Sequence, residues 1–592
     1  MLKITLPISL LCIALASSVG CELRFSIGTD RLAPQAPAIA DAVVIGRSTA
    51  QLDLVVPADD GDGVEAFKLE LHASESGPLI DVQVHPVSAS VGEQQSVILN
   101  NLRPGRGEYV AISAIDYAGN QSKSVWVGPF ENDFNYSGAV FPLEAEAGDN
   151  ALGYQFANSD FDGDGFSDVA VAAPFKQTMA GNGAGSVYIY RGSRDGLETK
   201  PSLVIDGNQK LAQFGNALTV IDWNNNGTLD LAVGAPFAND GDGAVYIFAG
   251  ENIAEQLTID SSSIRHFAGA ADAEVRSDGQ GWFEQAAFGF TLSPLDHDGD
   301  GRNELAVSAI AGGSSDDGNG GIVVLFADHG GSALLSEHSI TSLALDPEIA
   351  VSARVLTAPN SAPLFGITTV VLPDSQALAV ASYGGNRIAV FAQGPTPALG
   401  QVSYHRLDMA LDTELVSSLP PEALLGSSLG TISFPQASRG SGDQLIVGAY
   451  LANNGKGVVA IVPVVGPGFY PLEETANALI LGEAGQQLGS ASTRVNGDVD
   501  GDGIADLAIV GGRGKLELNI WYGDALPSGR LSSSSAAYHL SSPTGMIGEI
   551  PSIGGTPASI AWVGDTDGDE LDDLVWADWA SNQRDGLFEL LR

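Results

Sequence analysis

Five short segments of the chain carry oxygen-bearing side chains at one fixed spacing. In the clearest copy, residues 160–168, aspartates stand at the first, third, fifth and ninth positions. Carboxylates held this close together repel one another unless a cation lies between them. A hard cation such as Ca²⁺ takes six to eight oxygen ligands, and the backbone carbonyl at the seventh position can supply one more. The spacing therefore predicts a calcium site in each copy.

The five copies are named loops 1, 2, 3, 6 and 7, after the sequence repeats described below. A glycine at the sixth position of four copies allows the sharp bend that such a loop needs. The predicted ligands, with position 7 acting through its carbonyl, are Asp160, Asp162, Asp164, Phe166 and Asp168 (loop 1); Asp222, Asn224, Asn226, Thr228 and Asp230 (loop 2); Asp296, Asp298, Asp300, Arg302 and Glu304 (loop 3); Asp498, Asp500, Asp502, Ile504 and Asp506 (loop 6); Asp565, Asp567, Asp569, Leu571 and Asp573 (loop 7).

An EF-hand begins with the same pattern, but it needs a glutamate at position 12 that leads into a helix. Position 12 here is apolar in every copy: Val171, Val233, Val307, Ile509 and Trp576. Each of these residues sits in a short apolar run that is rich in β-formers. The loops are therefore expected to join two strands.

The elements that position these loops repeat along the chain. Loop starts at 160, 222, 296, 498 and 565 lie 62, 74, 202 and 67 residues apart, so two repeats without calcium are expected inside the long gap. They are found at 364–382 and 425–449, which makes seven repeats. Each is expected to supply strands A, B, C and D, except the seventh, which stops after its third strand. We expect a strand at Val140–Glu144 to pair with Leu587–Leu591 and so complete the last repeat.

Motifs around the loops resemble the FG-GAP repeat of integrin α-subunits. They include Gln213-Phe214-Gly215 before a loop, Val233-Gly234-Ala235-Pro236 after it, and then Gly243-Ala-Val-Tyr-Ile-Phe248. The resemblance covers residues 131–592 and implies an all-β fold with a seven-bladed β-propeller. It also implies that the A–B loops line one face of the propeller, while the B–C and D–A connections line the opposite, recognition face.

Residues 35–130 alternate apolar and polar side chains in about seven short runs, which is typical of a β-sandwich. The stretch from Leu102 to Tyr109, followed by the Ala118-Gly119-Asn120 turn, resembles the end of a fibronectin type III domain. The tryptophan that this family carries early in its core is absent here.

Residues 1–20 have the composition of an export signal, with Lys3 before an apolar stretch too short to span a membrane. Ser18-Val19-Gly20-Cys21 resembles a bacterial lipobox, which implies cleavage before Cys21, lipidation of Cys21, and a short linker over 21–34. The alternative is cleavage after Ala16, which would leave Cys21 as a free thiol. We therefore expect an exported protein, either an outer-membrane or cell-surface lipoprotein or a secreted one, that meets the membrane through its N-terminal lipid alone.

A formal charge of −45, from 72 acidic and 27 basic residues, argues against binding to nucleic acid. The match to G-x-S-x-G at 426–430 lies at a Phe-Gly position of a repeat, outside the strand–turn–helix that a nucleophile requires. His297 occupies position 2 of loop 3, where we expect the side chain to point outward. We expect a protein without catalytic activity that acts in adhesion or protein–protein interaction. Two alternatives stay open: a propeller enzyme of the polysaccharide lyase or glycosidase type, and a carbohydrate-binding surface protein.

The expected partner is a protein or glycan on the face opposite the calcium loops. The longest D–A connection, expected at about 261–286, contains Arg265, His266, Phe267, Trp282 and Phe283. Long loops are often functional, and aromatic and arginine side chains are typical contact residues. We expect Arg265, Phe267, Trp282 and Phe283 to bind the partner, with coverage of a sheet edge as the alternative role.

Overall fold

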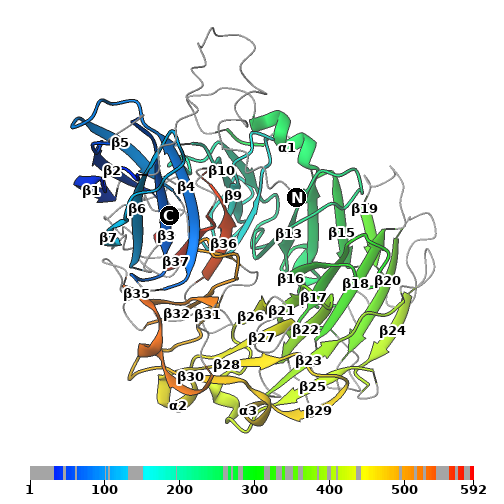
Figure 1. The fold of residues 1–592 in the computed structure, drawn as a ribbon. Helices are drawn as coiled ribbons and strands as arrows, with labels where there is room; N and C mark the ends of the chain where they lie inside the picture. The colour runs from blue at the N-terminus through cyan, green and yellow to red at the C-terminus, as the bar shows by residue number, and fades with distance from the viewer. Residues whose placement is uncertain are drawn as a thin grey trace, which may run out of the picture. The chain divides into compact units, whose positions relative to one another are not determined.

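The structure is a computed structural model. It describes residues 32–44, 49–59, 63–75, 77–100, 102–103, 107–130, 151–194, 196–257, 265–267, 271–277, 284–312, 321–328, 337–340, 351–357, 364–382, 386–395, 402–408, 411–434, 442–492, 497–512, 517–523, 528–541, 559–566, 568, 571–578 and 587–591. The chain is all-β and divides into two compact units, residues 1–137 and 138–592 (Figure 1). None of the helices in the described ranges is long and apolar enough to cross a membrane.

Unit 1 consists of two antiparallel sheets. One has the order β1-β2-β5 and the other the order β4-β3-β6-β7. The strands are β1 (Ala38–Val44), β2 (Ala50–Val55), β3 (Val64–His72), β4 (Leu79–Pro86), β5 (Gln94–Leu99), β6 (Glu108–Asp116) and β7 (Val125–Phe130). Alternate residues of β2 and β3, such as Leu52, Leu54, Phe67 and Leu69, are fully buried, as the period of two predicts.

Unit 2 contains seven successive sheets among its described residues. The first four strands of each, or three in the last, follow chain order as strands A to D. They are β8 (Phe156–Ser159), β9 (Asp168–Ala173), β10 (Ser186–Tyr190) and β11 (Leu203–Asp206) in sheet 1; β12 (Ala217–Ile221), β13 (Asp230–Ala235), β14 (Ala244–Phe248) and β15 (Ala273–Ser277) in sheet 2; β16 (Phe288–Leu295), β17 (Glu304–Ala309), β18 (Ile322–Asp328) and β20 (Val351–Thr357) in sheet 3.

The remaining sheets follow the same plan. They contain β21 (Phe365–Leu372), β22 (Ala377–Ser382), β23 (Arg387–Phe391) and β25 (Thr413–Val416) in sheet 4; β26 (Leu429–Phe434), β27 (Gly442–Ala449), β28 (Val458–Pro463) and β30 (Ala478–Leu481) in sheet 5; β31 (Ala491–Ser492), β32 (Leu507–Gly511), β33 (Glu517–Trp521) and β35 (Tyr538–Ser541) in sheet 6; β36 (Ser559–Gly564), β37 (Asp573–Asp578) and β38 (Leu587–Leu591) in sheet 7. The short helices are α1 (Gly250–Leu257), α2 (Ala452–Gly455) and α3 (Leu472–Thr475).

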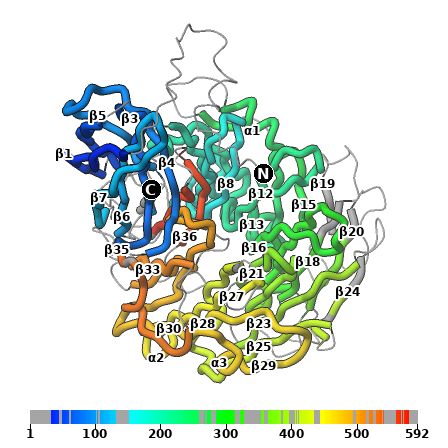
Figure 2. The backbone as a smooth tube through the Cα atoms, in the orientation of Figure 1, coloured from blue at the N-terminus to red at the C-terminus, as the bar shows by residue number. Residues whose placement is uncertain are grey.

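The A strands of successive sheets lie against one another. Contacts run from β8 to β12, then to β16, β21, β26, β31 and β36, and β36 returns to β8. Figure 2 follows this order from cyan through yellow to red, where β36 comes back beside the first sheet. The N-terminal and C-terminal sheets of unit 2 are therefore neighbours. The expected closing strand at Val140–Glu144 lies outside the described residues.

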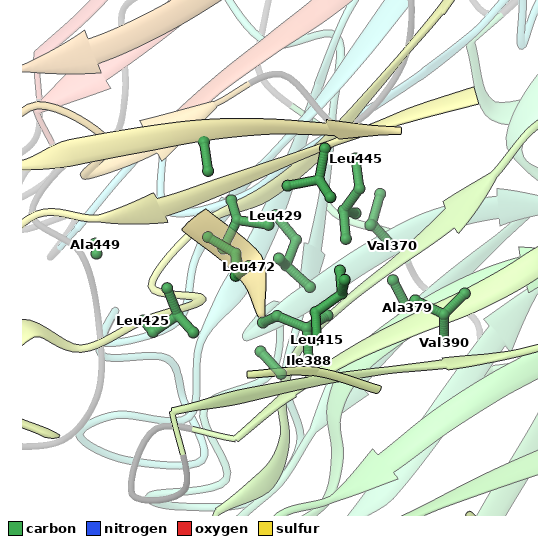
Figure 3. Packing of buried hydrophobic residues seen from close by; sticks show 14 of the residues in the cluster. Val370, Ala379, Ile388, Val390, Leu415, Leu425, Leu429, Leu445, Ala449 and Leu472 are labelled. Atoms are coloured by element: carbon green, nitrogen blue, oxygen red, sulfur yellow. The ribbon is translucent and has the colours of Figure 1, made fainter. Parts of the chain in front are cut away.

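The B strands are buried on both faces because sheets pack on either side of them. All six residues of β9, of β13 and of β17 are buried. Such strands read as continuous apolar runs instead of alternating ones, which explains the runs that follow each loop. Between sheets 4 and 5, aliphatic side chains such as Leu415, Leu429 and Leu445 fill the space (Figure 3).

Sheets 2 to 5 each gain a fifth strand that the sequence did not predict. It is parallel to strand D and comes from the C–D connection of the following repeat. The added strands are β19 (Glu337–Ile340) on β15, β24 (Val402–Arg406) on β20, β29 (Gly468–Pro471) on β25 and β34 (Gly529–Ser532) on β30.

Sheet 1 receives a shorter version of the same addition. The amide of Val204 donates to the carbonyl of Arg265, and the amide of Phe267 donates to the carbonyl of Val204, each over 2.7 Å. Because β15 begins at Ala273, residues 265–267 lie in the C–D connection of repeat 2. Our placement of them in a D–A connection was wrong: β15 is the D strand, and 265–267 precede it.

Candidate metal centres

In each calcium-type loop the first aspartate holds the backbone in a tight bend. In loop 1 the carboxylate of Asp160 accepts hydrogen bonds from the amides of Gly163, Asp164 and Gly165 at 2.7, 3.0 and 3.0 Å. Gly163 and Gly165 have φ angles of 76° and 93°, a region that glycine enters without strain. Loop 6 repeats these bonds around Asp498. The recurring glycines therefore serve the bend.

The carboxylate at position 9 ties the loop to the start of strand B and the end of strand C. Asp168 is fully buried and accepts from the amide of Phe161 in its own loop and from that of Gly192 after β10, both at 2.9 Å. Asp230 accepts equivalent bonds from Trp223 and Gly250. The same pattern holds in loop 6, where Asp506 accepts from Val499 and Gly523.

Three loops bring three carboxylates together as the sequence predicted. Their ligand oxygens lie within 4.8 Å of one another in the groups Asp160, Asp162 and Asp168; Asp296, Asp298 and Asp300; Asp498, Asp500 and Asp506. Oxygen-only donor sets of this kind fit a hard divalent cation. The groups combine positions 1, 3 and 9 in loops 1 and 6, and positions 1, 3 and 5 in loop 3.

Burial and mutual repulsion change the proton affinity of these carboxyl groups. The pKa of Asp168 rises to about 7 and that of Asp506 to about 8, first because burial disfavours the charged form and second because nearby aspartates repel it. Burial likewise raises the pKa of Glu304 to about 8. A cation would offset both effects, since it supplies the positive charge that each site lacks.

One positive group near loop 1 was not foreseen. Arg191, which follows β10, places its guanidinium 3.4 Å from Oδ2 of Asp162 and 3.0 Å from Glu198. Its signal in the sequence is only that an arginine follows the Val-Tyr strand. Arg191 thus offsets part of the negative charge of loop 1 from the side.

Loops 2 and 7 differ from the others. In loop 2, asparagines stand at positions 3 and 5, and Asn226 donates its side-chain amide to Glu251 on α1. The first aspartate still accepts from the amides of Asn226 and Gly227. In loop 7, Asp567 and Asp569 lie outside the described residues, while the carboxylate of Asp573 accepts from the amide of Thr566 at 2.9 Å.

Position 2 points inward, which corrects our expectation for His297. Its side chain is fully buried, and its Nε2 lies 2.7 Å from Nη1 of Arg354 on β20. Burial and the neighbouring Arg354 charge lower the pKa of His297 to about 4. The other position-2 residues, Phe161, Trp223, Val499 and Thr566, are also buried. Position 2 of these loops is therefore a core position.

Repeats 4 and 5 have a different connection in place of the calcium-type loop. In repeat 4, residues 373–376 make a tight connection between β21 and β22. In repeat 5, Asp443 opens strand B and accepts hydrogen bonds from the amides of Asp374 and Ser375 at 3.0 and 2.9 Å. A carboxylate at the start of strand B is therefore kept, and it binds the neighbouring turn instead of belonging to a calcium-type loop.

The expected partner-binding residues are described only in part. Phe267 packs against Phe248 with ring centroids 5.5 Å apart, and Nη1 of Arg265 donates to the carbonyl of Gln256 at 2.7 Å. Both contacts are internal to repeat 2. Trp282, Phe283 and Cys21 lie outside the described residues.

The sequence profile of the FG-GAP repeat matches residues 152–190 and 214–248, the A-to-C segments of repeats 1 and 2. These two segments are thus similar to FG-GAP repeats. Integrin alpha ina-1 of Caenorhabditis elegans is 35% identical over 131 residues, which is 20% of this chain and 11% of that protein. Integrin alpha-PS5 of Drosophila melanogaster is 35% identical over 160 residues, 27% of this chain and 15% of that protein.

The mouse phosphatidylinositol-glycan-specific phospholipase D is also similar, at 32% identity over 189 residues, or 30% of this chain and 20% of that protein. The chain thus spans a fifth or less of the length of these relatives. The solved Dos1 propeller aligns with 74% of this chain and 86% of its own at 10% identity, with a TM-score of 0.24, too low to support an argument. The FG-GAP repeats and the integrin α relatives support an integrin-type β-propeller for unit 2.

Proposed function

We propose that the chain is an exported, calcium-binding protein in which a seven-bladed FG-GAP propeller binds another protein or a glycan without catalysing a reaction. The observation that carries this proposal is the convergence of three carboxylates in each of loops 1, 3 and 6. Loop 1 lies within a segment that the FG-GAP profile matches. Lipidation at Cys21 and a fibronectin type III-like unit 1 belong to the same proposal. The sheet orders β1-β2-β5 and β4-β3-β6-β7 support the second point.

Calcium would be held by the loop carboxylates and would stabilise the fold. The cation supplies positive charge among groups that repel one another, so each loop keeps its bend with the carboxylates ionised. The chain's own contribution is the buried position-9 carboxylate, which is already fixed by two amides in loops 1, 2 and 6. Sites in extracellular modules typically bind calcium with dissociation constants of about 10⁻⁴–10⁻³ M.

The partner would bind at the end of the sheets opposite the calcium loops. Met179 in the B–C connection of repeat 1 is wholly exposed, and Leu211 in the following D–A connection is 60% exposed. The two connections are joined, because the amide of Leu211 donates to the carbonyl of Asn182 at 3.1 Å. Exposed apolar side chains on connected loops favour a protein or glycan contact there.

A protein and glycan array, probed with and without calcium, tests this function. We expect binding that is lost when both Met179 and Leu211 are replaced by serine. The matched control is Leu229→Ser, because Leu229 is 39% exposed but lies in loop 2 at the other end of the sheet. An array without any calcium-dependent ligand, or equal loss of binding in the control, would contradict the proposal.

A second candidate function, a hydrolase, is favoured by the similarity to phosphatidylinositol-glycan-specific phospholipases D. That similarity covers 20% of those enzymes. In this chain, a cavity of about 110 Å³ next to α3 is lined mainly by aliphatic side chains, with Glu473 as its acidic residue. Glu473 is engaged by the amide of Ser418 at 2.9 Å. Cleavage of a phosphatidylinositol-glycan substrate by the purified chain would favour the enzyme over the binding protein.

A further inference from the structure

Loops 6, 7 and 1 follow one another around unit 2, and one backbone hydrogen bond recurs between them. The amide at position 8 of each following loop donates to the carbonyl at position 1 of the loop before it. Asp572 donates to Asp498 over 3.2 Å, and Ser167 donates to Asp565 over 3.0 Å. The second of these bonds joins the last sheet to the first.

A side-chain contact recurs in the same register. The position-7 side chain of the following loop covers the position-4 glycine of the loop before it. A Cβ on Gly501 would lie 2.7 Å from Leu571, and one on Gly568 would lie 2.8 Å from Phe166. A side chain on either glycine would therefore require the covering side chain, Leu571 or Phe166, to shift.

Two further bonds strengthen these junctions. The carboxylate of Asp572 accepts from the amide of Asp498 at 2.9 Å, which makes the junction of loops 6 and 7 reciprocal. The amide of Ser193 donates to the carbonyl of Thr566 at 3.1 Å, which adds to the junction of loops 7 and 1.

Among the residues that the structure describes, loops 2 and 3 do not show this arrangement. Gly163, at position 4 of loop 1, has no atom of loop 2 within 4 Å of the place where a Cβ would lie. The position-1 carbonyl of loop 3 accepts instead from the side chain of Gln393 at 2.7 Å, and Gln393 belongs to repeat 4, which has no calcium-type loop.

We propose that calcium binding in loop 6 and calcium binding in loop 1 are coupled through the described residues of loop 7, while loops 2 and 3 bind calcium independently. Positions 1 and 7 are both ligand positions in the predicted sites. The carbonyl at position 1 contacts the following loop, and the side chain at position 7 contacts the preceding loop. A cation that fixes one loop also fixes the contacts of its neighbour, so the neighbour loses less freedom when it binds in turn. The proposal rests on the calcium binding proposed above.

This coupling gives calcium a structural task at the junction between the chain's first and last sheets. Loop 7 lies in sheet 7 and loop 1 in sheet 1, and the two share the bonds of Ser167 and Ser193 described above. The hydroxyl of Ser559 on β36 also donates to the carbonyl of Gly153. Calcium in loop 1 would therefore stabilise the contact between the two ends of unit 2.

Calorimetric calcium titration of the full chain tests the coupling. For the wild type we expect a cooperative phase with a Hill coefficient above one. Leu571→Ala and Asp572→Ala should each reduce that coefficient to about one. They should also raise the calcium concentration at the midpoint of the phase about fivefold or more. Asp572→Asn should keep the coupling, because the amide oxygen can still accept from Asp498 while the charge is lost.

The matched control is Leu229→Ala, at position 8 of loop 2, which should leave the isotherm unchanged. Calcium binding without cooperativity in the wild type, or cooperativity that survives both alanine variants, would overturn the coupling and leave the calcium function intact. The complete absence of calcium binding would overturn the proposed function itself. Circular dichroism of each variant before titration confirms that it is folded.

Discussion

The backbone amide of Gly192 donates to Oδ1 of Asp168 over 2.9 Å, so the end of strand C is fastened to the last ligand position of loop 1. Gly192 reaches this place because it lacks a side chain. A Cβ there would lie 2.5 Å from the carbonyl oxygen of Ser167. Gly250 and Gly523 meet the same restriction in repeats 2 and 6.

We therefore expect Gly192→Ala to destabilise unit 2 by about 1–3 kcal/mol, the usual range for an overpacked site. It should also weaken calcium binding in loop 1, since Asp168 would shift with the backbone. Chemical denaturation monitored by tryptophan fluorescence measures the first effect. Gly466→Ala is the control, because Gly466 has no atom within 4 Å of a Cβ. Equal stability of the two variants would refute this explanation of the glycine.

Calcium should raise the unfolding temperature of the protein, because it binds the native state and not the unfolded chain. Replacing Asp500 and Asp502 by alanine should remove one bound ion and part of this gain. Differential scanning fluorimetry with millimolar calcium or with EDTA measures the shift, and mass spectrometry under native conditions counts the ions. A melting curve indifferent to EDTA would contradict the prediction.

Calcium binding should strengthen as the pH rises. The native pKa values of Asp168, Glu304 and Asp506 are raised to about 7, 8 and 8, so the calcium-free native state holds protons that the unfolded chain has released. Without calcium, stability should therefore fall as the pH rises from about 4 to about 8. With calcium, the ion replaces these protons, so the gain in unfolding temperature should grow across the same window. A gain that is independent of pH would show that these carboxyl groups are not the ligands.

Replacement of Phe267 by alanine should destabilise unit 2 by about 2 kcal/mol. This is less than the roughly 3–5 kcal/mol typical of a fully buried phenylalanine, because the Phe267 ring is only partly buried. The ring of Phe267 meets Phe248 edge-on, and its backbone extends sheet 1. The unfolding midpoint in denaturant measures the loss. Met179→Ala is a suitable comparison, since the Met179 side chain is fully exposed and should contribute nothing to stability. An unchanged midpoint for the Phe267 variant would return this residue to the candidate partner surface.

Deletion of residues 22–125 should leave unit 2 folded, because each unit has a core of its own. The truncated protein should keep its calcium-dependent melting transition and lose only a separate transition from unit 1. Scanning calorimetry of the two proteins makes the comparison. Aggregation of the truncated protein in the presence of calcium would contradict the independence of the units.

Much of the fold follows from short-range regularities. The apolar runs after the loops form strands B, and the Val-Tyr segments such as Ser186–Tyr190 form strands C. These segments could be recognised because a strand that is buried on both faces has an uninterrupted run of apolar residues. The spacing of the loops located the two repeats that have no calcium-type loop, at β21–β22 and β26–β27. The glycine and aspartate spacing likewise located the three carboxylate clusters.

The fifth strands could not be read in this way. β24 pairs with β20, and the two are separated by strands β21 to β23 of another sheet. An added parallel strand of four or five residues is held mainly by backbone hydrogen bonds, so it needs no apolar pattern of its own. The inward direction of His297 was missed for a related reason, since the Arg354 that meets it is 57 residues away in the sequence.

The borrowed fifth strands also determine where the chain can be cut. A fragment that ends after strand D of one repeat leaves that strand without the neighbour that the next repeat provides, and so exposes a bare sheet edge that can recruit another chain. Gene duplication or circular permutation would therefore succeed at breakpoints inside the C–D connection. The breakpoint should follow the fifth strand that this connection gives to the previous sheet, and precede strand D. The sequence unit that can be duplicated or moved as a whole is therefore shifted along the chain relative to the sheet, because each of sheets 2 to 5 contains one strand from the next repeat.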